Sequence, residues 1–167
     1  MVEGLERYGE GTASQLLYLQ LAAAGCSSKD ADHAASHLGK AVGICTLLKG
    51  TAVHAAQRRS YLPIDLCAEH KVSQEEVYRG VVSEGLRDVA LKVASVAKGH
   101  LDEARALAGK VPPEARPLLL PAVACEHYLR ALERSNFDLF EPRLLRGGAS
   151  PLWHALSIKY HLLRRSY

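Results

Sequence analysis

The sequence predicts an all-α helical bundle, and three observations lead to this fold class. Apolar residues recur at spacings of three and four along most of the 167-residue chain, which is the pattern of amphipathic helices. Capping and helix-ending residues stand at the borders of these stretches. No stretch has a convincing strand pattern or a repeat of solenoid length. We expect residues 1–167 to form a single helical domain with one core.

The first two predicted helices are defined by apolar spacing and by a glycine between them. Residues 4–24 carry apolar side chains at helical spacing until Gly25, which ends the run. A long helix is expected over residues 31–58, with Asp30 as its N-cap. Apolar and small residues lie nearly all the way round this second helix, which predicts a position in the middle of the bundle.

Three glycines interrupt the long helix at Gly39, Gly43 and Gly50. A glycine inside a helix costs about 1 kcal/mol relative to alanine. We therefore expect another element to pack closely against this helix.

The next helix is predicted from a capping box. Ser73 and Glu76 have the spacing of that motif, and an amphipathic stripe then continues to about Gly109. The two prolines that follow end the stripe. A further helix is expected from about residue 117 to residue 134, with Pro121 tolerated in its first turn.

The last predicted helix begins at Ser150–Pro151, after an irregular segment over residues 135–149. It ends at Arg164–Arg165, where positive charge suits the negative end of the helix dipole.

Composition excludes several functional classes. A net charge of +3 and few aromatic residues apart from tyrosine argue against a nucleic-acid partner. None of the four cysteines lies in a C-x-x-C pair, so a zinc ribbon or redox motif is not expected, and we predict reduced thiols inside the cell. No stretch predicts a transmembrane helix, and the first residues resemble neither a signal nor a transit peptide.

One stretch is similar to a family signature. Residues 37–63 resemble, without a gap, the second signature of the squalene/phytoene synthase family, and seven positions carry the match: Leu38, Gly39, Ala41, Arg59, Tyr61, Leu62 and Pro63. Residues 5–17 and 100–105 resemble flanking parts of the same family. The resemblance implies the helical fold of isoprenoid synthases, truncated on its N-terminal side.

The same resemblance implies that the family's chemistry is lost. Family members hold Mg²⁺ with two aspartates one helical turn apart, and the metal grips a substrate diphosphate. Gly50 and His54 stand at those two positions. Glycine has no side chain, and imidazole is a poor Mg²⁺ ligand. We therefore expect no catalytic residue, no metal ion and no cofactor.

Residues 10–19 and 136–144 resemble one branch of the family, the assembly factors of mitochondrial complex I (NADH:ubiquinone oxidoreductase). That resemblance implies a non-catalytic protein at the matrix side of the inner membrane, with complex I subunits or assembly intermediates as partners. It also implies that the chain is the C-terminal portion of a family member. The targeting segment and the first acidic pair would then precede residue 1.

Two alternatives stay open beside the assembly factor. One is an enzyme, a Mg²⁺-dependent prenyl-diphosphate synthase of the phytoene or squalene type. The other is an isoprenoid or lipid carrier that retains the old cavity, with the expected lining residues Gly39, Gly43, Thr46 and Gly50.

Cationic and aromatic residues of the signature are candidate ligand contacts. Lys49, Arg59 and Tyr61 could contact an anion such as a phosphate head group. We favour a solvated basic rim with Tyr61 packed in the core.

Histidines offer a second candidate site. His33 and His37 stand four apart, a spacing that can bind zinc with help from Cys26 or Asp30. We favour a polar helix face.

The C-terminal helix carries basic and apolar residues, so it could touch an anionic membrane surface, although such helices more often dock on the bundle. We also expect uncovered apolar faces along residues 31–58 and 82–104, which predict self-association or a protein partner.

Overall fold

The computed structural model describes residues 1–145 and 150–167, and over these residues the chain forms helices and turns without a strand. The predicted all-α class is confirmed. The elements are α1 (Val2–Gly9), η1 (Glu10–Ser14), α2 (Gln15–Ala23), α3 (Lys29–Ala56), α4 (Ile64–Glu69), α5 (Gln74–Tyr78), α6 (Glu84–Ala106), η2 (Leu107–Gly109), η3 (Arg116–Leu119), α7 (Pro121–Arg134), α8 (Pro142–Leu145) and α9 (Pro151–Arg164).

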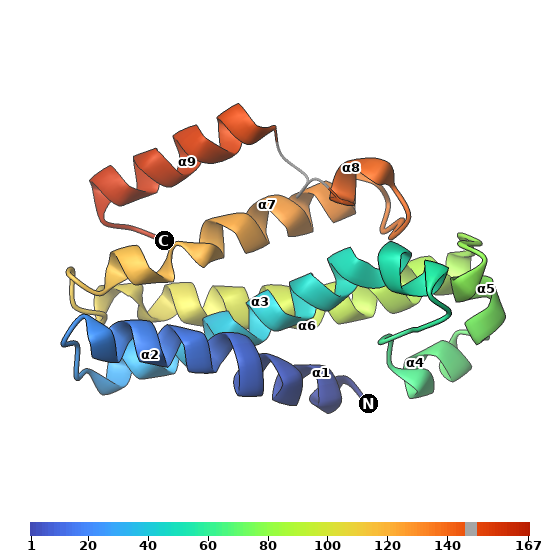
Figure 1. Cartoon of the computed structure of the whole chain (residues 1–167), viewed down its shortest axis with the longest axis horizontal. Helices are drawn as coiled ribbons and strands as arrows, with labels where there is room; N and C mark the ends of the chain where they lie inside the picture. The colour runs from blue at the N-terminus through green and yellow to red at the C-terminus, as the bar shows by residue number, and fades with distance from the viewer. Residues whose placement is uncertain (146–149) are drawn as a thin grey trace.

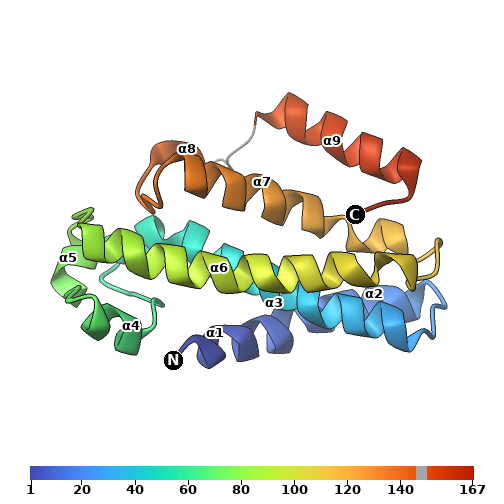
Figure 2. The same cartoon turned by 180° about the vertical axis from the view of Figure 1, so that it is seen from behind.

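The helices stack in layers (Figure 1). The rod made by α1, η1 and α2 lies on one side of the central pair α3 and α6, and α7 lies on the other side with α9 beyond it. Figure 2 shows α6 running the length of the bundle in front of α3. The short helices α4 and α5 close one end of this pair.

The first predicted helix is confirmed as one rod. Its middle, η1, is a π-helical stretch, which is rare in proteins. The rod ends at Ala23, and Gly25 follows with φ +72°, a conformation that glycine adopts without strain.

The long helix α3 takes the predicted central position, because it contacts α1, η1, α2, α6 and α7. The predicted N-cap was wrong by two residues. The Ser28 hydroxyl, rather than the Asp30 carboxylate, accepts the backbone N–H of Ala31 at 3.3 Å. Asp30 lies in the first turn of α3, where its negative charge suits the helix dipole.

The segment after Ser73 corrects the prediction of one continuous helix. The capping box of Ser73 and Glu76 is present, but it begins the short helix α5. Gly80, with φ +66°, breaks the chain direction. Ser83 then caps α6 by accepting the Leu86 N–H at 3.2 Å. The short helix α4 was not predicted.

The C-terminal elements largely follow the prediction. Helix α7 begins at Pro121, while residues 116–119 form the separate turn η3. Within the segment predicted to be irregular, residues 142–145 form α8, and residues 146–149 lie outside the described residues. Ser150 caps α9 by accepting the Trp153 N–H at 3.2 Å.

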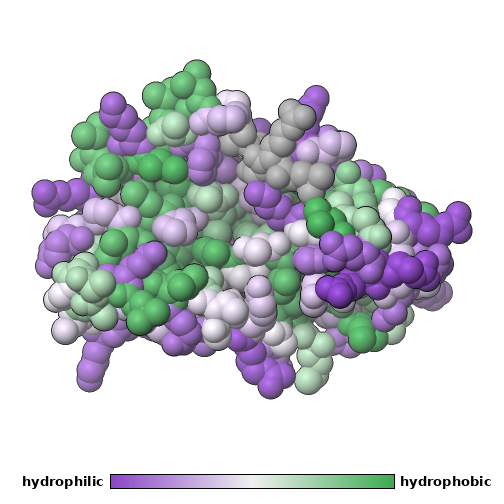
Figure 3. Space-filling view, in the orientation of Figure 1, coloured by the Kyte–Doolittle hydropathy of each residue, from purple (hydrophilic) through white to green (hydrophobic). Residues whose placement is uncertain are grey.

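The expectation of uncovered apolar faces along residues 31–58 and 82–104 was wrong. Side chains on these helices form the core, including Leu38, Ile44, Leu48, Val89, Val93 and Leu101. They are buried because α3 and α6 cover each other, and because α1, η1 and α7 cover α3. Exposed apolar side chains instead gather on α9, at the upper left of Figure 3. None of the described helices is both long and apolar enough to cross a membrane.

Candidate functional site

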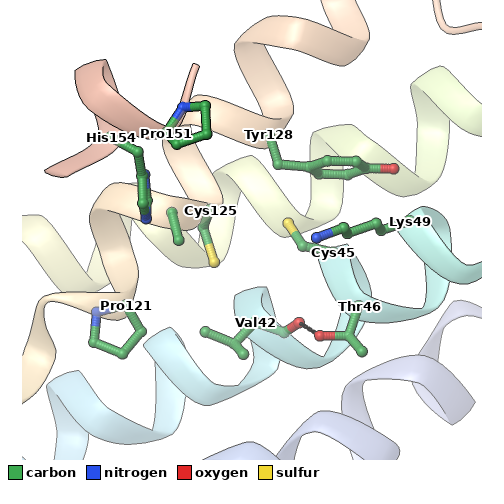
Figure 4. A pocket seen from close by; sticks show the side chains of 10 residues that line it. Val42, Cys45, Thr46, Lys49, Pro121, Cys125, Tyr128, Pro151 and His154 are labelled. Atoms are coloured by element: carbon green, nitrogen blue, oxygen red, sulfur yellow. Dashed lines mark hydrogen bonds between the residues drawn. The ribbon is translucent and has the colours of Figure 1, made fainter. Parts of the chain in front are cut away.

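A cavity of about 460 Å³ lies between α3, α7 and the first turn of α9 (Figure 4). Its volume falls in the range of small-molecule sites in proteins. Most of the wall is apolar, and the lining residues are Val42, Cys45, Thr46, Lys49, Pro121, Ala124, Cys125, Tyr128, Pro151 and His154. The cavity suits an apolar ligand that carries few polar groups.

Two polar groups could orient such a ligand. Lys49 brings a cation to the wall. Tyr128 is buried, and its hydroxyl has no hydrogen-bond partner in the described part of the chain. Burial raises the pKa of Tyr128, so this hydroxyl stays protonated, but its oxygen is closed off from the cavity and would donate to a ligand only after the ring moves. The Thr46 hydroxyl is already used, since it donates to the Val42 carbonyl at 2.7 Å.

Two buried thiols face the cavity from opposite helices, Cys45 from α3 and Cys125 from α7. A hydrogen bond with Cys125, together with burial, raises the pKa of the Cys45 thiol well above its usual value. A protonated thiol is a weak nucleophile. Cys45 therefore acts as an apolar wall residue.

Gly50 and His54, which the sequence resemblance places at the positions of the family's acidic pair, carry no carboxylate. A Cβ at Gly50 would lie 2.9 Å from Nε2 of His54, so the imidazole fills the space beside the glycine. The His54 ring packs edge-on against Tyr61, with 4.8 Å between the ring centroids. His54 is therefore packed between the Gly50 backbone and the Tyr61 ring.

The three candidate anion contacts do not gather at one site. Lys49 lines the cavity, whereas Tyr61 lines a small hollow on the α1 side of α3, beside Leu5 and Leu62. Arg59 is exposed beyond the end of α3. The favoured expectation that Tyr61 is a core residue was wrong, because the ring lies on His54 and is 49% exposed.

Only Thr46, of the four residues predicted to line the cavity, does so. Gly39 and Gly43 face the opposite side of α3. A Cβ at Gly39 would lie 2.3 Å from the Ser14 backbone nitrogen, and one at Gly43 would lie 2.5 Å from the Gly9 Cα. These two glycines allow the close packing that the sequence predicted, but they do so against η1 and α1.

One histidine of α3, His37, takes part in a hydrogen-bonded chain. Nδ1 of His37 lies 2.9 Å from Nδ1 of His100, and Nε2 of His100 lies 2.8 Å from a carboxylate oxygen of Glu6. Burial, followed by the charge of His100, lowers the pKa of His37. Over residues 1–145 and 150–167, no group of three or more His, Cys, Asp or Glu side chains is arranged to hold a metal ion.

Sequence reasoning missed the α7 and α9 walls of the cavity. Tyr128, Cys125 and His154 carry no motif, and their spacing within each helix is ordinary. These walls depend on how α7 crosses α3, and the residue pattern within a single helix does not predict that crossing. A polar tyrosine on the apolar face of α7 was the one available hint.

Comparison with known proteins gives one family. The family model described as squalene/phytoene synthase matches residues 2–150. The chain is 46% identical over 143 residues to "NADH dehydrogenase (ubiquinone) complex I, assembly factor 6" of Rattus norvegicus, covering 86% of this chain and 43% of that protein. The Homo sapiens protein of that name is 44% identical over the same shares. The Dictyostelium discoideum homolog is 38% identical over 84% of this chain and 40% of its own length.

A solved structure shares the fold. Squalene synthase HpnC from Alicyclobacillus acidocaldarius superposes with a TM-score of 0.74 at 23% identity, covering 81% of this chain and 52% of that one. The chain therefore spans less than half the length of these curated relatives and about half of that structure.

Proposed function

The chain belongs to the squalene/phytoene synthase family, and we propose that it acts without catalysis as part of an assembly factor for mitochondrial respiratory complex I. The names of its relatives are the observation that carries this proposal. Proteins from mammals, an insect and Dictyostelium, 38–46% identical to this chain, are all named as complex I assembly factor 6 or its homolog.

The proposal concerns a portion of such a factor. The matched share of the rat protein is 43%, so we propose that residues 1–167 form the C-terminal portion of one synthase-like helical domain. The partners would be complex I subunits or assembly intermediates. The place of action would be the matrix side of the inner mitochondrial membrane.

The absence of chemistry is supported by the residues at the family's metal positions. Mg²⁺ takes hard oxygen ligands, and neither Gly50 nor the His54 imidazole supplies one. The His54 ring instead packs against the Tyr61 ring, with 4.8 Å between the ring centroids. These residues do not fit a magnesium ion.

A second candidate function is that of a carrier for a lipid-like ligand, and the cavity favours it. The walls are mostly apolar, Lys49 can pair with an acidic head group, and the ring of Tyr128 lines the cavity beside it. Extraction of the purified protein with organic solvent, followed by mass spectrometry, tests this candidate. A stoichiometric lipid that is lost when Tyr128 and Lys49 are replaced would support it.

The assembly function is tested by rescue in cells that lack the endogenous factor. The chain is expressed behind a mitochondrial targeting segment, and assembled complex I is measured on a native gel beside a full-length relative. Restoration of complex I by the chain supports the proposal for this portion. Rescue by the full-length relative alone would assign the function to residues outside this chain, and failure of both would remove the assignment.

The non-catalytic part of the proposal has its own test. We expect no product when the chain and the full-length relative are incubated with prenyl diphosphates and Mg²⁺. Formation of a condensed isoprenoid by either protein would overturn it and favour the synthase alternative.

A further inference from the structure

Helix α9 carries its apolar face outward, away from the bundle. With about 100° per residue, Leu152, Leu156 and Leu163 lie on one side of the helix, and Trp153 and Tyr160 lie next to them. All five are exposed, with Leu163 at 76% and Leu152 at 71%. None of the residues of α9 is buried. A helix that docks on a globular core normally turns its apolar face inward, so the orientation of α9 is inverted.

Two polar contacts tie α9 and the residues after it to the bundle, beside the half-buried Ile158. Nδ1 of His154 lies 3.0 Å from Nδ1 of His127 on α7, and the two rings meet edge-on. After the helix, the buried Tyr167 donates its hydroxyl to the Ala104 carbonyl of α6 at 2.8 Å. These two contacts hold both ends of the segment, and they fix the apolar side toward solvent.

Positive charge borders the outward face. Lys159 lies beside Leu152 and Leu163 on the helix surface, and Arg164 lies on the far side beside Tyr160. The Arg164 guanidinium stacks 5.5 Å from the Tyr160 ring centroid and donates to its hydroxyl at 3.1 Å. Residues 150–167 contain Lys159, Arg164 and Arg165 and no acidic residue.

We propose that α9 docks in the plane of an anionic lipid surface. The outward face combines an apolar stripe, a tryptophan and a tyrosine suited to the membrane interface, and lysine and arginine on either border. Long cationic side chains extend from such borders to lipid head groups. Protein interfaces normally include several direct hydrogen bonds, and in this stripe only Trp153 and Tyr160, at its edge, have side chains that can form them. This inference goes beyond the proposed function and requires that the remainder of the synthase-like domain leaves this face open, which vesicle binding by a full-length relative tests in parallel.

The probe is built into the chain, because Trp153 is its only tryptophan and is 62% exposed. The whole chain is mixed with vesicles of phosphatidylcholine, with or without 30 mol% phosphatidylglycerol. We expect a blue shift of Trp153 emission and co-sedimentation with the anionic vesicles. Binding should weaken as salt is raised, since salt screens the attraction between lysine or arginine and the lipid head groups.

Matched variants test whether the apolar face of α9 is the surface that binds vesicles. Leu156→Gln with Leu163→Gln should weaken vesicle binding by at least about tenfold, because two apolar contacts with the bilayer are lost. Leu19→Gln on α2 is the control, since Leu19 is 67% exposed on another surface, and it should bind like the unmodified chain. Lys159→Glu should weaken binding to anionic vesicles by about fivefold or more.

The outcomes distinguish a lipid surface from a second copy of the chain as the occupant of this face. Vesicle binding that is lost in the α9 variants and kept in Leu19→Gln supports the proposal. No binding to anionic vesicles, or equal binding by all variants, overturns it. A dimer detected by light scattering that the α9 variants dissociate, in the absence of vesicle binding, also overturns it and assigns the face to a second copy. Circular dichroism of each variant distinguishes loss of binding from loss of fold.

Discussion

The two sides of α3 are built in opposite ways. Toward α1 and η1, backbone meets backbone, since Gly39 lies against Ser14 and Gly43 against Gly9. Toward α7 and α9, the same helix borders a cavity of about 460 Å³. One helix therefore carries a closed face that sets the position of its neighbour and an open face that leaves room beside it.

This difference separates what holds the fold from what is free to change. A close backbone contact tolerates no larger side chain, because rigid atoms cannot move aside. An open face tolerates changes in size, and it can receive a ligand or simply stay open. We expect substitutions on the closed face to affect folding and substitutions on the open face to affect binding.

The largest effect is expected for Gly39→Ala. Its Cβ would lie 2.3 Å from the backbone nitrogen of Ser14 and 2.4 Å from the Ser14 Cα, so the rod of α1, η1 and α2 would have to move. We expect a loss of about 3 kcal/mol in the free energy of unfolding, at the upper end of overpacking effects. Urea denaturation followed by circular dichroism measures it.

Gly99→Ala is the matched control for that prediction. Gly99 lies inside α6, and a Cβ there meets nothing within 4 Å. Alanine should stabilise this helix by about 0.5–1 kcal/mol, because glycine loses more backbone entropy on folding. Equal effects of the two substitutions would contradict the closed-face interpretation.

The next effect concerns a carboxylate that joins the rod to α3. Glu10 of η1 accepts the hydroxyls of Tyr18 and Ser36, each at 2.7 Å, and lies 3.9 Å from Nζ of Lys40. Burial opposes ionisation, but the hydrogen bonds and Lys40 outweigh it, so the pKa of Glu10 is lowered. Glu10→Ala should cost about 1.5 kcal/mol, as is typical of bonds to a charged group.

Thermal or urea unfolding of Glu10→Ala is compared with that of Glu3→Ala. Glu3 is an exposed acidic residue in the first turn of α1, and its loss should change stability by less than about 0.5 kcal/mol. A Glu10 effect no larger than the Glu3 effect would mean that the π-helical stretch is held by packing alone.

The closed face could be anticipated from the sequence, and the open face could not. Gly39 and Gly43 stand inside a helix at a cost that close packing explains, so a neighbour was predictable, although not which one. The walls contributed by Tyr128 and His154 depend on how α7 and α9 cross α3. Crossing geometry is set by side-chain packing between helices, and the pattern within one helix does not report it.

The orientation of α9 was unpredictable for a related reason. Its sequence is amphipathic, and such helices normally bury their apolar face. The inversion follows from two contacts made by residues distant in sequence, His127 with His154 and Tyr167 with Ala104. In contrast, the caps Ser73 and Ser150 were predictable, because a cap is a local interaction between residues three positions apart.

A smaller effect is expected from pH. Burial, followed by a neighbouring histidine, lowers the pKa of His37 and of His127. Below the usual histidine pKa of about 6.5, the unfolded chain binds protons that the folded chain excludes. The free energy of unfolding should therefore be largest above pH 6.5 and fall as the pH drops through the folded pKa values.

Two double substitutions assign this pH dependence to its helices. His127→Gln with His154→Gln removes the link between α7 and α9, and His37→Gln with His100→Gln removes the link between α3 and α6. Each should flatten the decrease in stability between pH 7 and pH 5.5, measured by urea unfolding at each pH. An unchanged slope in both variants would assign the titration to other groups.

The smallest effect on stability is expected for the buried Tyr128 hydroxyl beside the open face. The buried Tyr128 hydroxyl has no partner in the described residues, so Tyr128→Phe removes a desolvated group without breaking a protein hydrogen bond. We expect stability to stay equal or rise by up to about 1 kcal/mol. Tyr18→Phe on the closed face is the control, because that hydroxyl donates to Glu10 at 2.7 Å and its loss should cost about 1 kcal/mol. If Tyr128→Phe were destabilising by as much as Tyr18→Phe, its hydroxyl would have a partner in solution. A buried water or another hydrogen-bond partner of Tyr128 would then contribute to the stability of the fold on this side of α3.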